Sequence, residues 1–252
     1  MDFYNEIFKR KSFHLFKETE KISEEELREI EGFITKLTPL CPEIKTEIKI
    51  VKEKETTCKR GGEYCLLFYS EIKDKYLRNI GFLGEQVDLY LASKNIGALW
   101  YGVGKTEIKS ELGLDFVIMI NISKMPEEKF RKDMFKAKRK ALGEVWVGES
   151  LNIENILRFA PSACNTQPWI TENLGGKLSV YRYKKPGKRG IMPANKVIYY
   201  NRIDMGIYLY FLETLLKHEN ISFERKLLPD NSTLDIEKTL IAEYIYKKEK
   251  CR

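Results

Sequence analysis

The stretch RFAPSACNTQPW, residues 158–169, decides how this chain is interpreted. An apolar, helix-like segment runs here into two prolines, two small residues and two side-chain amides. These are Pro161, Ser162, Ala163, Asn165, Gln167 and Pro168. Proline ends a helix, small side chains let a flat or bulky group approach the backbone, and amides both donate and accept hydrogen bonds. The pattern predicts a binding loop. A plain helix end followed by a turn and an edge strand, with Trp169 in the core, remains the alternative.

The composition indicates a globular protein with one large core or two modest ones. The chain has 252 residues, 43% of them hydrophobic, which is enough to fold without metals or disulfides. Its 44 Lys and Arg are interspersed with 37 Asp and Glu, for a net charge of +7. Because these charges are not gathered into blocks, we expect a solvated surface and no nucleic-acid partner.

The cysteines, histidines and apolar runs exclude several other classes. The cysteines have no CxxC spacing and the N-terminal MDFYNEIFKRK has no long apolar run, so we expect reduced thiols and a cytoplasmic protein. The apolar run at 115–122 is far shorter than the ~20 residues of a spanning helix, so no membrane segment is expected. With His14 and His218 as the only histidines, we expect no metal site. The five cysteines are Cys41, Cys58, Cys65, Cys164 and Cys251.

The first half is predicted to mix helices and strands. Its predicted helices are 2–9, 23–37 and 81–97, and its predicted strands are 46–51, 63–69 and 115–122. Ser23 is the expected N-cap of the second helix, with Glu26 completing a capping box.

The second half repeats this order of elements. Its predicted helices are 152–159 and 204–218, and its predicted strands are 169–172, 177–183, 222–228 and 240–248. Pro39 and Pro161 differ by 122 residues, as do Gly84 and Gly206. The shared offset predicts an internal duplication. Residues 124–140, rich in charge, are expected to form a helical connector with a solvated face.

A second candidate binding segment is FKRKSFHLF, residues 8–16. Arg10, Lys11, Ser12 and His14 bring two cations, a hydroxyl and an imidazole into five residues. An arginine fork, a serine hydroxyl and a lysine point charge suit a phosphate group. A solvated turn after a short helix is the alternative.

A third segment is ASKNIGALWYGVGK, residues 92–105. We expect a helix to end near Asn95 and Gly97, and the glycines at 102 and 104 to allow positive φ and to bring main-chain N–H groups near a ligand. The spacing is neither a Rossmann fingerprint nor a P-loop. A helix C-cap and a simple loop remain the alternative.

Taken in order, the three segments resemble the flavin-binding segments of the nitroreductase family. RKSFH (10–14) is similar to its R-x-S-x-[RK] pattern, with His14 in place of the usual basic residue, and PSACNTQPW (161–169) reproduces P-S-x-x-N-x-Q-P-W completely. NIGALWYG (95–102) is similar to its G-L-G-S-x-W-I-G loop. The family fold is a mixed α+β homodimer with flavin mononucleotide (FMN) in the interface.

This sequence differs from the usual nitroreductase chain in the position of one segment, and the difference bears on the domain organisation. The P-S-x-x-N segment lies in the second half, whereas its usual place in the first half is taken by TPLCPE (38–43). The chain therefore resembles the tandem-repeat branch of the family, with residues 1–123 and 141–252 as two nitroreductase-like halves and 124–140 as connector. It implies a monomer that imitates the family dimer, with one complete flavin site and one degenerate site.

The resemblance implies an FMN-dependent oxidoreductase. It would take hydride from NADH or NADPH at flavin N5 and pass it to a small flat acceptor such as a nitroaromatic or a quinone. The flavin carries the chemistry, so no catalytic side chain is expected. Phe13 is a further candidate for the cleft wall. The cofactor-binding residues implied are Arg10, Lys11, Ser12, His14, Trp100, Tyr101, Gly102, Arg139 (or Lys138), Pro161, Ser162, Ala163, Asn165 and Gln167.

Two other functions stay open at this point. A flavin carrier or sensor without turnover would use the same site but would not be bleached by NAD(P)H. A basic adaptor that binds nucleic acid or protein through 124–140 would bind without flavin and in a salt-dependent way.

Overall fold

The computed structural model describes residues 2–183, 190, 192–230 and 238–248, and it divides the chain into two compact units. The N-terminal unit is Asn5–Met134. The C-terminal unit is Met1–Tyr4 together with Phe135–Arg252. The units therefore separate inside the predicted connector, and helix α1 (Tyr4–Lys9) crosses from one to the other along the chain.

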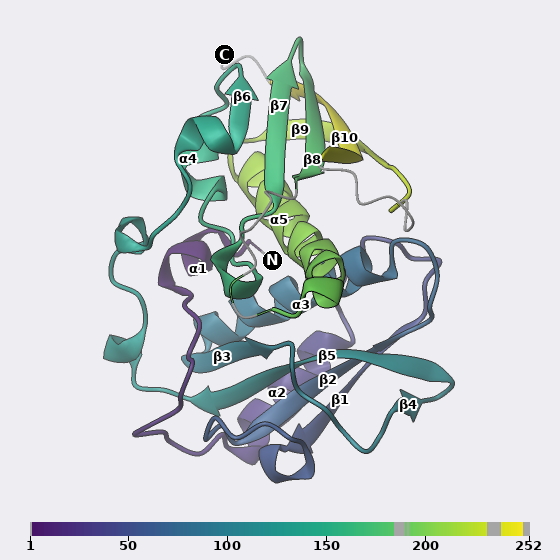
Figure 1. Cartoon of the computed structure of the whole chain (residues 1–252). Helices are drawn as coiled ribbons and strands as arrows, with labels where there is room; N and C mark the ends of the chain where they lie inside the picture. Colours follow the sequence, from purple (N-terminus) through teal and green to yellow (C-terminus); the bar gives the residue numbers. More distant parts are fainter. Residues whose placement is uncertain (1, 184–189, 191, 231–237, 249–252) are drawn as a thin grey trace. The chain divides into compact units, whose positions relative to one another are not determined.

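The N-terminal unit is an antiparallel sheet covered by a long buried helix (Figure 1). Its strands lie in the order β1-β2-β5-β3, with short β4 paired to β5. Both central strands are almost continuously apolar because both of their faces are buried. The elements are α2 (Glu24–Ile34), β1 (Thr46–Lys52), β2 (Tyr64–Ser70), α3 (Tyr76–Ser93), β3 (Ile96–Tyr101), β4 (Ser110–Glu111) and β5 (Leu114–Lys124).

The C-terminal unit is a second sheet packed on its own long helix. The order is β6-β7-β8-β10-β9; β6 and β7 are parallel and the other pairs are antiparallel. Trp169 of β7 is fully buried and stacks on Tyr208 of the helix, as predicted for a core residue. The elements are β6 (Trp146–Gly148), α4 (Glu154–Leu157), β7 (Trp169–Leu174), β8 (Lys177–Tyr183), α5 (Val197–His218), β9 (Ile221–Leu227) and β10 (Lys238–Lys248).

The two units share one topology, considered separately. In each unit, two strands form a hairpin, a long helix follows, and two more strands come after it. These are β1, β2, α3, β3 and β5 in one unit and β7, β8, α5, β9 and β10 in the other. In both sheets the last of the four strands lies between the second and the third. The turn before the first strand is also held alike: Cys41 N donates to Asn79 of α3, and Ala163 N donates to Asp204 of α5. The two N–H groups differ by 163 − 41 = 122 residues, which is the offset seen in the sequence. The observed topology is compatible with the predicted duplication.

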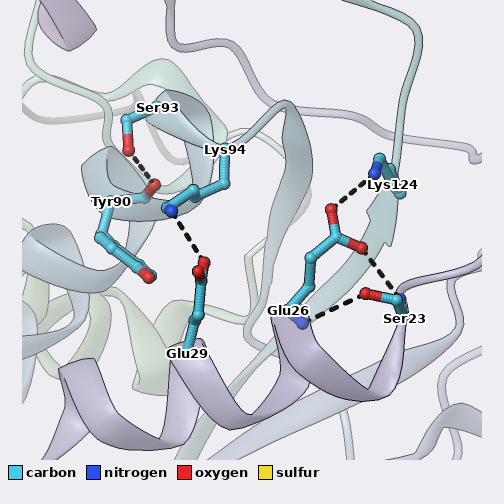
Figure 2. A network of polar contacts seen from close by, with 7 residues as sticks. All are labelled: Ser23, Glu26, Glu29, Tyr90, Ser93, Lys94 and Lys124. Atoms are coloured by element: carbon cyan, nitrogen blue, oxygen red, sulfur yellow. Dashed lines mark hydrogen bonds and ion pairs between the residues drawn. The ribbon is translucent and has the colours of Figure 1, made fainter.

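The predicted capping box at the start of α2 is present and is part of a polar network (Figure 2). Glu26 N donates to Ser23 Oγ at 3.2 Å, and Ser23 N donates to Glu26 Oε2 at 2.9 Å. Glu26 also pairs with Lys124 at the end of β5, and Glu29 pairs with Lys94 just after α3 at 2.7 Å. These partly exposed pairs hold α2 to the unit, each contributing less than about 1 kcal/mol.

Several predicted boundaries were wrong. The helix predicted over 81–97 is α3, which starts five residues earlier and ends at Ser93, and Asn95 then takes the left-handed φ of 58°. Residues 96–101 form β3, and Gly97, Gly102 and Gly104 do not have positive φ. The connector is not an α-helix: it contains short 3-10 turns at Glu127–Lys129 and Met134–Lys136. Pro126 lacks an N–H, and the apolar residues Phe130 and Met134 after it are buried without a continuous helix.

Two classes of feature are absent from the residues that the structure describes. None of their helices is both long and apolar enough to cross a bilayer. They also contain no group of three or more His, Cys, Asp or Glu side chains that could hold a metal ion.

Candidate functional site

The arm, which we define as residues 10–16, lies along strand β3. Ser12 pairs with Ala98 in a parallel bridge, and Phe13 N donates to Ala98 O at 3.0 Å. A Cβ on Gly97 would come within 2.8 Å of the Phe13 ring, so this glycine is required for close approach and not for φ. The structure thus brings together two segments that were predicted separately, the basic arm and the strand with Trp100.

Arg10 is buried at the start of the arm and is held by helix α3. Its Nε donates to Asp88 Oδ2 at 2.8 Å, and Trp100 Nε1 donates to the same oxygen at 2.9 Å. Glu85 lies 3.9 Å from Arg10 Nε. Burial, and then the charge of Asp88, raise the pKa of Glu85 well above its usual range, so Glu85 is neutral and Asp88 is the counter-charge of Arg10.

The terminal nitrogens of Arg10 are left available by this arrangement. Neither of them makes a hydrogen bond within the described part of the chain. Asp88 thus orients the guanidinium through Nε, while the N–H groups of the two terminal nitrogens stay unused among the described residues. Sequence reasoning missed Asp88 and Glu85. The signal was two acidic residues three apart in an otherwise apolar helical pattern.

Arg131 is a second residue that sequence reasoning missed. It follows β5, and its N–H donates to Lys9 O at 3.0 Å, which brings it beside the arm. Burial and then the positive charge of Arg10 lower its pKa to about 10. Burial, Arg131 and Lys129 likewise lower the pKa of Lys11. The resemblance placed a basic residue of this kind at Lys138 or Arg139, but both of these belong to the C-terminal unit.

Arg10, Lys11 and Arg131 form a cationic group that carries three positive charges beside Asp88, which pairs with Arg10 and also acts on Arg131. Among the residues described, neither the Lys11 ammonium nor the Arg131 guanidinium has a hydrogen bond or an ion pair. Lys11 lies over the Phe13 ring, 4.7 Å from its centroid. Arg10 lowers the pKa of Arg131, and Arg131 lowers that of Lys11, so a bound anion would stabilise these cations.

The remaining residues predicted for the site in this unit, His14, Tyr101 and Gly102, are not part of the cationic group. His14 is exposed, and no described residue forms a hydrogen bond or an ion pair with it. Tyr101 is half-buried at the end of β3, with the Arg60 guanidinium 5.5 Å from its ring centroid. Gly102 follows it and is also half-buried.

The loop 161–167 of the C-terminal unit is a strained turn held by many hydrogen bonds. Cys164, Asn165 and Gln167 have φ of 50°, 55° and 48°, left-handed values that cost a residue with a side chain roughly 1 kcal/mol or more each. Gln167 N donates to Ser162 Oγ at 2.9 Å, and Ala163 N donates to Asp204 Oδ1 at 2.8 Å.

The segment 138–140 supplies the other side of this loop. Arg139 donates to Asn165 Oδ1 at 3.0 Å, and Asn165 Nδ2 donates to Lys138 O at 3.0 Å. Lys140 N donates to Gln167 Oε1 at 2.8 Å. Arg139 and Gln167 thus form hydrogen bonds within the loop, and their role as cofactor ligands stays a prediction.

Two polar groups of the loop keep donors that no described residue uses. The Ser162 oxygen accepts from Gln167 N, and its O–H proton is given to none of the residues that the structure describes. Asn165 Nδ2 carries two protons and gives one of them to Lys138 O. Asn165 is exposed and Ser162 half-exposed, so both can reach a ligand.

Asp204 beneath the loop is an unusual carboxyl group. It is buried on α5, and no described residue contacts its Oδ2 through a hydrogen bond. Burial raises the pKa of Asp204 to about 8, a shift that the hydrogen bond from Ala163 N partly opposes. Asn201, three residues earlier on the same helix face, has a buried Oδ1 that is also without a partner among these residues.

Comparison with known proteins identifies related sequences and folds. Residues 2–215 match the family described as "Putative TM nitroreductase". A "putative nitroreductase" from Thermotoga maritima has a similar solved structure, with TM-score 0.63 and 18% identity over 97% of this chain and 94% of that one. A nitroreductase family protein from Clostridium novyi NT aligns with TM-score 0.40 and 16% identity over 52% of this chain and 92% of its own. No curated protein matches the sequence.

Proposed function

This chain is a member of the nitroreductase family, and we propose that it is an FMN-dependent NAD(P)H oxidoreductase. Family membership indicates an oxidoreductase, and the similarity to the Thermotoga structure supports the nitroreductase-type fold. The flavin, its phosphate ligands and the reductant are our proposal. FMN when bound would supply the hydride-accepting ring, and the protein would bind and orient it.

The observation that carries this proposal is the unbalanced cationic group of the N-terminal unit. A phosphate monoester bears close to two negative charges at neutral pH and accepts hydrogen bonds at three oxygens. Lys11 and Arg131 have no ion-pair partner among the residues described. The carboxylate that acts on Arg131, Asp88, is already paired with Arg10, whose two terminal nitrogens stay unused among these residues. These donors fit the phosphate of FMN, with the Ser12 hydroxyl as a further donor.

The loop 161–167 is suited to a flavin ring because its backbone is fixed before a ligand arrives. Three left-handed residues and a surrounding set of hydrogen bonds hold the Ser162 hydroxyl and the Asn165 amide in place. Among the described residues both keep an unused donor, which could bind a carbonyl oxygen of an isoalloxazine. Preorganised donors lose little entropy on binding.

The experiment compares FMN with riboflavin, which has the same ring but no phosphate. In wild type we expect FMN to bind at least about 100-fold more tightly, since charge-assisted hydrogen bonds contribute about 1.5–3 kcal/mol each. Replacing Lys11 and Arg131 together by Ala should remove most of that preference and leave riboflavin affinity unchanged. Asn165→Ala should weaken both ligands alike. Lys36→Ala, an exposed cation of the same unit, is the control and should change neither.

The same samples test whether the protein turns over. Bound flavin should lose its visible absorbance on addition of NADH or NADPH and regain it with a quinone or a nitroaromatic. We propose one FMN per chain and a monomer, to be checked by flavin content and sedimentation. Flavin that binds but is not bleached would indicate a carrier or sensor. Equal affinity for FMN and riboflavin in wild type would contradict the phosphate site.

A further inference from the structure

A pair of cysteines lies beneath a loop that the proposed function does not use. Cys65 is in the central strand β2, and Cys58 is in the covering loop, residues 53–62. Both are fully buried, and neither is in a disulfide. The two cysteines lie in one buried cluster, and the Thr56 hydroxyl touches both: Cys58 N donates to Thr56 Oγ1 at 3.1 Å, and that oxygen lies 3.6 Å from Cys65 Sγ.

Cys65 belongs to an apolar core cluster, yet its sulfur has polar neighbours that favour a thiolate. Asn121 Nδ2 donates to Cys65 Sγ at 3.3 Å. Thr56 Oγ1 lies 3.6 Å from that sulfur, and its proton can be given either to the sulfur or to Glu53 O, at 2.9 Å. A cysteine that only fills a core needs no such donors.

The Asn121 side chain that donates to Cys65 is itself unfavourable for stability. It is fully buried within the apolar strand β5, and its Oδ1 has no partner among the described residues. A Cβ on Gly62 would collide with this amide, so the loop keeps a glycine where Asn121 needs room. An unsatisfied buried oxygen is unfavourable, and the arrangement leaves the Asn121 donor facing Cys65.

The hydrogen bonds separate the two thiols into an acid and a base. Donation from Cys58 is the largest cause that lowers the pKa of Cys65, with Thr56 and Asn121 adding to it against the effect of burial. The same interaction, and then burial, raise the pKa of Cys58. Of the two thiols, Cys65 therefore loses its proton more readily, with Cys58 as its hydrogen-bond donor.

The cover over the pair is a short loop with little regular structure. Only Glu53–Glu55 forms a 3-10 turn, and Thr57, Lys59 and Arg60 beside Cys58 are exposed. The loop is held by Glu53 Oε1, which accepts from the N–H groups of residues 60, 61 and 62 at 2.9–3.2 Å. Local opening of such a loop takes less free energy than global unfolding and admits a small oxidant.

We propose that Cys58 and Cys65 form a redox-active dithiol that a hydroperoxide converts to a disulfide. The Cys65 thiolate attacks one peroxide oxygen, the O–O bond breaks, and hydroxide leaves and is protonated to water. The Cys58 thiol then attacks the Cys65 sulfenic acid, the S–O bond breaks, and a second water leaves. Hydrogen peroxide gains two electrons and the two thiols lose them.

The test uses the full chain with Cys41, Cys164 and Cys251 replaced by Ser, the last of these lying outside the described residues. Treatment with one equivalent of hydrogen peroxide should remove both remaining thiols and give a peptide that links residues 58 and 65. Cys58→Ser in this background should stop at a sulfenic acid on Cys65, which dimedone traps. Cys65→Ser should react at least about tenfold more slowly, because it lacks the stabilised thiolate.

The Asn121→Leu variant tests whether Asn121 acts on the Cys65 thiolate or only fills the core. It should slow disulfide formation by about tenfold or more by removing a charge-assisted donor to the thiolate. Should this variant not fold, Thr56→Val tests the same point at the second polar group. Dimedone labelling of Cys58 in place of Cys65, or thiols that persist after prolonged treatment with excess peroxide, would overturn the proposal.

Discussion

Replacing Asp204 by Asn should make the protein more stable, and by an amount that grows with pH. Asp204 is buried, and only one of its oxygens has a partner among the described residues, the N–H of Ala163. Asn keeps an oxygen for that bond and places an NH₂ where the second oxygen was. Asn201 on the same helix face offers a buried acceptor that has no partner among these residues.

The magnitude follows from the pKa of the carboxyl group. Burial raises the pKa of Asp204 to about 8 in the folded state, while an unfolded Asp has a pKa of about 3.9. Between these values the unfolded chain has lost the proton that the folded chain still holds. The stability associated with Asp204 is therefore full below about pH 4 and declines up to about pH 8, by about 4 kcal/mol between pH 5 and pH 8.

The assay is urea unfolding of wild type and Asp204→Asn at pH 5, 6.5 and 8. We expect the difference in unfolding free energy to grow in favour of the variant by up to about 4 kcal/mol over this interval. Asp115→Asn, at an exposed position of β5, controls for the change in net charge. A difference for Asp204→Asn that stays constant with pH would refute the view that this carboxyl is neutral in the folded protein.

Two further predictions concern α2 and α3. Gly84→Ala should destabilise the protein by about 1–3 kcal/mol because its Cβ would collide with the Trp100 indole. Gly32→Ala, with open space around it, should stabilise helix α2 by up to about 1 kcal/mol. Thermal unfolding should therefore give a lower melting temperature for the first variant and a higher one for the second. Asp88→Asn removes the counter-charge of the arm's buried arginine and should cost about 3–5 kcal/mol. Glu85→Gln, which replaces a neutral acid, should cost much less by the same measurement, and equal losses would contradict this assignment of charge.

Much of the fold could be predicted because its signals are local. The capping box of Ser23 and Glu26 joins groups three residues apart, and the continuous apolar runs of β2 and β5 come from strands buried on both faces. The start of α3 was missed because Arg78 and Asn79 are polar yet fully buried, which breaks the helical pattern of apolar residues. Asn79 is there to hold the N–H of Cys41, a partner 38 residues away.

The candidate site was predictable only in part. The segments with Arg10 and with Asn165 carry recognisable motifs, and the sequence by itself determined that both are present, that one carries cations and that the other carries small residues and amides. It did not determine their partners. Arg131 and Asp88 have no local signature that links them to the arm, being 121 and 78 residues away from Arg10.

Tertiary structure alone decided which charges of this protein are compensated. The sequence determines helix caps and apolar runs because these depend on neighbours along the chain, and it supplies the motif residues themselves. Burial and the groups that packing brings together decide that Arg10 pairs with Asp88, and that Lys11 and Arg131 have no ion pair of their own among the described residues. They also decide that the pKa of Glu85 is raised. Coulomb energies and desolvation vary with distance in space and not with separation in sequence.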